Sequence, residues 1–158
     1  YEVLRDVSTK TQILDISTAH FSAQSMRPLA GTDVREQNQV VRFRAARLSP
    51  TPPEIVLSSV EFEFGVSDLL EKEMCQIHGT VVVVYRVIDD VAEDAMDLFA
   101  EVHGMYHAWP YIRELVGSCS LRLGLAGVVL PVWISPARFP PKGEFTVIAT
   151  KPSAYSND

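Results

Sequence analysis

Residues 55–66, IVLSSVEFEFGV, alternate between apolar and polar side chains over most of their length. In an extended chain successive side chains point to opposite faces, so this alternation separates an apolar face from a polar one. The apolar face holds Val56, Val60, Phe62, Phe64 and Val66, and the polar face holds Ser59, Glu61 and Glu63. The stretch therefore predicts a half-buried strand of an antiparallel sheet.

Three other stretches have an extended pattern. Residues 40–48 place Val41, Phe43 and Ala45 on one face and Arg42 and Arg44 on the other. Residues 73–88 contain four consecutive valines at 81–84, which are apolar on both faces and predict a central strand or one covered by another subunit. Residues 11–23 form a fourth run, in which the alternation is imperfect.

From residue 91 onward the apolar period changes to that of a helix. Apolar side chains recur at Val91, Ala95, Phe99 and Val102, and the acidic Glu93, Asp94 and Asp97 suit the first turns of a helix. Gly104 predicts a weak point or an end. A second helix is expected from Pro110, with an apolar stripe reaching Leu123 and a stop at Gly124. Four strands followed by two helices predict an α+β fold.

Length and composition indicate one domain over residues 1–158, with an irregular proline-rich tail from about 135 to 158 that holds a short strand within 145–149.

The net charge of −6 argues against a nucleic-acid surface, and no apolar run approaches the length of a membrane span. Acidic residues outnumber basic ones by twelve to two within residues 51–108. Such an excess predicts a solvated face, with attraction of a basic or extended partner as the alternative. Two cysteines give no disulfide framework, so a cytoplasmic location is expected.

The residues capable of chemistry do not form a catalytic motif. His103 and His107 are four residues apart, with Glu101 and Cys75 as further ligands in a metal-site hypothesis, but two half-buried histidines are the simpler interpretation. Cys75 and His78 resemble a nucleophile and its base, yet residues three apart in a strand point to opposite faces. We therefore expect no metal, no cofactor and no enzymatic activity. A small cysteine/histidine or metal-dependent hydrolase is the alternative.

Residues 109–114, WPYIRE, followed by 121–124, LRLG, and 130–132, LPV, resemble the SecB family of protein-export chaperones. The tryptophan in first place is especially similar to the SecB-like chaperones that accompany toxin–antitoxin systems. The resemblance covers residues 11–134, and the four extended runs occur in the family's order.

This resemblance implies a four-stranded antiparallel sheet followed by helices, assembled as a dimer of dimers. It implies an ATP-independent chaperone that holds non-native polypeptides or preproteins in apolar grooves, either for export or to protect a dedicated client such as an antitoxin. Structural roles are expected for the family-motif residues Trp109, Pro110, Tyr111, Arg113 and Glu114. Where typical members carry acidic contacts for the translocation motor ATPase, this chain has His20, Gln24 and Gln76, so binding of that motor is not expected.

Large apolar side chains are the candidates for client binding. The expected groove residues are Phe43, Phe62, Phe64, Tyr85, Met105 and Tyr106. Packing in the core is the competing interpretation for each aromatic residue, because large apolar side chains are usually buried. Met105 and Tyr106 are the strongest candidates, since they lie beside Gly104, where the helix is expected to open.

Overall fold

The computed structural model describes residues 2–26, 32–33, 38–49, 52–67, 73–126, 128, 130 and 145–148. Its elements, in chain order, are α1 (Glu2–Thr9), β1 (Thr11–Ser25), β2 (Thr32–Asp33), β3 (Asn38–Leu48), β4 (Ile55–Ser67), β5 (Glu73–Val87), α2 (Glu93–Arg122), β6 (Leu125–Ala126) and β7 (Phe145–Ile148). The four predicted strands are confirmed as β1, β3, β4 and β5, and the α+β class with them.

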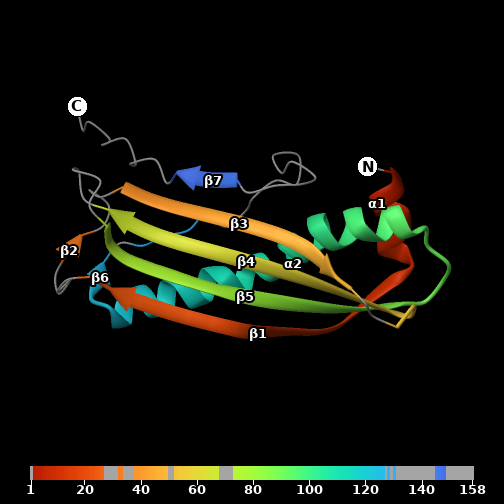
Figure 1. The fold of residues 1–158 in the computed structure, drawn as a ribbon, viewed down its shortest axis with the longest axis horizontal. Coiled ribbons are helices and arrows are strands. Elements are labelled where there is room, and N and C mark those ends of the chain that lie inside the picture. The colour runs from red at the N-terminus through yellow and green to blue at the C-terminus, as the bar shows by residue number, and fades with distance from the viewer. Residues whose placement is uncertain are drawn as a thin grey trace, which may run out of the picture.

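The main sheet has the strand order β1-β5-β4-β3-β7, and every neighbouring pair is antiparallel (Figure 1). The valine-rich strand β5 lies between β1 and β4, as its two apolar faces predict. The short strand β7 falls within the predicted 145–149 segment and pairs with the edge of β3. A separate two-stranded parallel ladder joins β2 to β6. The rest of the predicted irregular tail lies outside the described residues.

One face of the main sheet, called the inner face below, carries the core. The long helix α2 crosses behind the sheet and packs on β3, β4 and β5 (Figure 1). Register places Val60 opposite Val81 and Phe43 opposite Phe62, so apolar side chains meet in rows across the strands. The ring of Trp109 on α2 meets Phe43 edge to face at a centroid distance of 5.0 Å. Burial of these side chains against α2 stabilises the fold.

The two predicted helical stretches are joined into the single helix α2, because Gly104 is a packing site and not a break. At position 104 the helix lies against Ser58 of β4, and a Cβ there would overlap the Cβ and Oγ of Ser58. The Ser58 hydroxyl donates a hydrogen bond of 2.6 Å to the carbonyl of Ala100. Pro110 lies inside the helix, and Gly124 follows its end with a φ of 81°, as the predicted stop requires.

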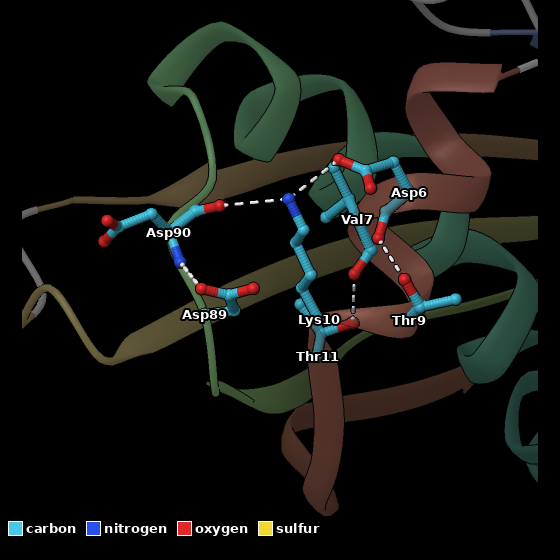
Figure 2. A network of polar contacts seen from close by, with 7 residues as sticks. All are labelled: Asp6, Val7, Thr9, Lys10, Thr11, Asp89 and Asp90. Carbon is cyan, nitrogen blue, oxygen red and sulfur yellow. Dashed lines mark hydrogen bonds and ion pairs between the residues drawn. The ribbon is translucent and has the colours of Figure 1, made fainter.

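The N-terminal helix α1 was not predicted from the sequence. Its Val7 is buried, and the helix packs on α2. Figure 2 shows Lys10 at its end, where Nζ lies 3.1 Å from a carboxylate oxygen of Asp6 and donates to the Asp90 carbonyl at 3.3 Å. The hydrogen bond to Asp6 is the main cause that raises the pKa of Lys10. These contacts connect α1 to the segment between β5 and α2.

Among the residues that the structure describes, the helices contain no apolar stretch of the length that a bilayer requires.

Candidate functional site: an apolar strip along β1

Strand β1 is an edge of the sheet, and its inner face carries an apolar strip, defined here as Ile13, Ile16 and Phe21. Ile16 and Phe21 are half-buried against the core, whereas Ile13 retains 41% of its accessible surface. These three residues lie opposite Tyr85, Val83 and Gly79 of β5. The strip therefore continues the apolar inner face to the edge of the sheet, beyond the strands on which α2 packs.

Two irregularities explain why the alternation of β1 is imperfect. The register of β1 on β5 shifts between Ile13 and Asp15 and again between Thr18 and His20, so Leu14 and Ala19 are extra residues without a partner. Each such bulge moves the following side chain to the other face of the sheet. The bulges therefore keep Ile13, Ile16 and Phe21 on one face although their spacing is not regular.

One flank of α2 contacts β5, the strand that pairs with β1. His103, His107 and Tyr111 are spaced by four residues and so lie above one another on the helix. The Tyr85 hydroxyl lies 2.9 Å from Nδ1 of His107, and Tyr85 is also the ladder partner of Ile13. Tyr111 is 43% exposed. The strip on β1 and Tyr111 on α2 are thus partly exposed apolar surface. These four residues are the candidate for client binding and are called the client surface below.

Burial governs the ionisation of the polar groups in this region. It raises the pKa of the Tyr85 hydroxyl, which therefore stays protonated at neutral pH. Burial lowers the pKa of His103, with repulsion from His107 as a second cause, and burial also lowers the pKa of His107. Both imidazoles are consequently neutral at pH 7, and His103 stacks on Phe99 at a ring-centroid distance of 4.5 Å.

Most of the side chains expected to bind a client lie in the core of the protomer. Those with at most 3% of their surface exposed are Phe43, Phe62, Phe64, Tyr85 and Met105. Tyr106, in the middle of α2, is the exception, because 42% of its accessible surface is exposed. The helix does not open at Gly104, so Met105 faces the sheet. The sequence reasoning did not single out the strip of β1, because its irregular spacing hid which side chains share a face.

The family-motif residues lie along the second half of α2. Trp109 is 5% exposed and packs on Phe43, while Pro110 and Tyr111 are exposed. Nε of Arg113 donates a 3.2 Å hydrogen bond to the carbonyl of Leu130, which ties the helix to the segment after it. Glu114 is exposed. In this structure the motif contributes packing and one connection of the chain to the core.

The residues considered for catalysis or metal binding are not brought together. Cys75 is fully buried on the inner face, and burial, with a smaller contribution from Glu73, raises the pKa of its thiol to about 11. His78 is exposed on the opposite, outer face, as the strand period predicted. Among the described residues, no three His, Cys, Asp or Glu side chains stand in an arrangement that would hold a metal ion. His103 and His107 therefore do not form the centre considered with Glu101 and Cys75.

The four long antiparallel strands β1, β5, β4 and β3, with the long helix α2 packed on one face of their sheet, make up a fold that is found in a solved structure. The solved structure of the Mycobacterium tuberculosis Rv1957 SecB-like chaperone, in complex with a ChAD peptide from the Rv1956 HigA1 antitoxin, has this fold. The likeness covers 86% of this chain and 99% of that chain, with a TM-score of 0.72 and 19% sequence identity. No protein-family model matches the sequence, and no curated protein sequence matches it. The resemblance inferred from residues 11–134 is thus confirmed for the fold.

The neutral histidines on α2 predict a loss of stability in mild acid. In the unfolded chain an imidazole titrates near pH 6.5, whereas in the folded chain the pKa of His103 and of His107 is lower. The unfolded state therefore binds more protons as the pH falls through 6.5, and stability present above that pH is lost below it. Urea unfolding at pH 7.5 and 5.5 should show a smaller loss in the His103→Gln/His107→Gln variant than in the parent. An equal loss in both proteins would contradict this origin.

Proposed function

We propose that this protein is an ATP-independent chaperone that holds extended, non-native polypeptide segments against its client surface. The observation that carries the proposal is the fold shared with a SecB-like chaperone solved in complex with an antitoxin peptide. Apolar side chains left partly exposed at the β1 edge of the sheet support it. Partly exposed apolar and aromatic side chains suit an extended client, because they offer contact area without requiring one client sequence.

An antitoxin is the client class that the comparison favours, and a general role in protein export is the second. His20, Gln24 and Gln76 all lie on the outer face, where the family resemblance placed acidic contacts with the translocation motor. Amide and imidazole side chains in place of carboxylates there favour a dedicated client over delivery to that motor. The proposal includes no enzymatic step, and the burial of Cys75 away from His78 weighs against the hydrolase alternative. A cytoplasmic location remains a prediction from cysteine usage.

The function is tested by aggregation of a slowly refolding client without ATP. The protein should suppress light scattering by the client at a ratio near one tetramer per client. The Ile13→Ser/Tyr111→Ser variant should need several-fold more protein for the same suppression, because both side chains are partly exposed on the client surface. Leu48→Ser is the matched control, since Leu48 is equally exposed but lies on the outer face.

If the parent protein does not suppress aggregation of the client, the chaperone proposal is wrong. Suppression that the Ile13→Ser/Tyr111→Ser variant retains in full would keep the function and move the client surface elsewhere. Loss in the Leu48→Ser control would place client binding on the outer face.

The proposed assembly is a homotetramer, a dimer of dimers. Strand β1 pairs on one side with β5, and along its 15 residues no other described strand pairs with its second edge. An unpaired backbone edge of this length is normally covered, and a second copy whose strand pairs with that edge is the simplest cover. Light scattering on a sizing column should give a mass of about 70 kDa, four times 17.6 kDa, and a stable monomer would contradict the proposal.

A further inference from the structure

The four histidines of the chain form two pairs of similar spacing in different surroundings. The rings of His103 and His107 are 5.8 Å apart, but each is engaged, one by stacking on Phe99 and the other through Tyr85. The rings of His20 and His78 are 5.6 Å apart, and both side chains are exposed on the outer face. Neither His20 nor His78 hydrogen-bonds to another described residue, so their ring nitrogens are available to a ligand.

The position of His20 is set by the bulge at Ala19. Thr18 lies opposite Val81 on the inner face, and in a regular strand His20 would share that face. The extra residue instead pairs His20 with Thr80, on the outer face, diagonal to His78. Bulges are frequent beside functional sites because they redirect a side chain. Here the bulge brings an imidazole from the edge strand to an imidazole on its neighbour.

The geometry of this pair fits two ligands on one metal ion. Zinc binds an imidazole nitrogen at about 2.0–2.1 Å, so a tetrahedral angle at the metal places the centroids of two ligating rings about 5 Å apart. The observed separation is 5.6 Å, with the ring planes at 84°. A small rotation of either exposed side chain would close the remaining difference.

The surroundings supply space and a further oxygen donor. A hollow of about 220 Å³ on the outer face is lined by both histidines, by Glu61 and Glu63 of β4, and by Arg42 and Arg44 of β3. Glu63 is engaged with Arg42 at 2.8 Å, whereas Glu61 is exposed and forms no ion pair with another described residue. Among the described residues no three potential ligands already stand in place, so two imidazoles alone would hold the ion at first. A water molecule, or the Glu61 carboxylate after rotation of its side chain, would complete the coordination.

We propose that His20 and His78 form a binding site for a divalent transition-metal ion that favours imidazole, such as Zn²⁺, Ni²⁺ or Cu²⁺. The ion would join edge strand β1 to β5 on the outer face, directly behind the apolar strip. This site is independent of the chaperone proposal, since it uses the opposite face of the sheet. A metal bound only by the folded state also stabilises that state.

Titration of the full chain with ZnCl₂, followed by calorimetry, tests the site. We expect saturable binding of one ion per chain, weakened at least about tenfold by His20→Gln or by His78→Gln and less by Glu61→Gln. His103→Gln and His107→Gln are the matched controls and should bind as the parent does. Zn²⁺ should raise the melting temperature of the parent and leave that of the His20→Gln variant unchanged.

A second measurement needs no variant. Cu²⁺ added below stoichiometry should broaden the imidazole proton resonances of His20 and His78 before those of His103 and His107. The proposal is overturned by an absence of saturable Zn²⁺ binding, by binding that survives both outer-face substitutions, or by earlier broadening of His103 and His107.

Discussion

The Ile112→Asp protein should be unfolded and not simply dissociated into folded subunits. Ile112 has none of its surface exposed within the protomer and belongs to the core cluster beneath α2. An unpaired carboxylate in such a site costs about 3–5 kcal/mol, which is a large part of the roughly 5–15 kcal/mol that stabilises a domain. Far-UV circular dichroism should show a loss of helix and sheet together.

Leu121→Asp is the control for this prediction. Leu121 lies on the same helix but is 74% exposed, so its substitution should leave the protomer folded. If Ile112→Asp gives a folded monomer with native circular dichroism, then the inner surface of α2 is a contact between subunits and the assignment of the core is wrong. If Leu121→Asp stays folded but lowers the mass in light scattering, then Leu121 is a subunit contact.

The sheet was predictable mainly because the apolar side chains of β3 and β4 recur with a period of two and β5 has its run of valines. In β4 the side chains from Val60 to Val66 alternate between apolar and polar or small residues, and the apolar ones are the buried ones. Strand β1 was harder, since the bulges at Leu14 and Ala19 depend on its pairing with β5 and not on a local signal. The apolar strip and the His20–His78 pair both result from those bulges. The sequence thus predicted the scaffold better than the surfaces that a partner would meet.

Helix α2 shows a similar limit. A glycine in the middle of a helical pattern usually marks a weak point, because glycine costs about 1 kcal/mol relative to alanine in a helix. At Gly104 this expectation of a weak point is wrong because of a tertiary contact: only a residue without a side chain allows α2 to lie against Ser58. Helix α1 was overlooked because it is short, although Val3, Leu4 and Val7 have helical spacing and Asp6 and Lys10 form an i,i+4 ion pair.

Replacing Gly104 by alanine should lower the stability of the fold by about 2 kcal/mol, because overpacking of a core costs about 1–3 kcal/mol. The new Cβ would overlap Ser58, so α2 would have to move away from β4 or Ser58 would have to lose its bond to Ala100. For a chain of this size the melting temperature should fall by roughly 4–8 °C. Thermal unfolding followed by circular dichroism measures the change.

Gly117→Ala is a matched control in the same helix, since a Cβ at that position would meet no heavy atom within 4 Å apart from the adjoining backbone of α2. It should stabilise the protein by up to about 1 kcal/mol, the ordinary gain from glycine to alanine in a helix. Adding Ser58→Gly to Gly104→Ala removes the atoms that the new methyl group meets, so the double variant should recover part of the loss. If the Gly104→Ala protein melts at or above the melting temperature of the parent, then a methyl group fits between α2 and Ser58. Gly104 would then not be the residue that sets the distance between helix and sheet.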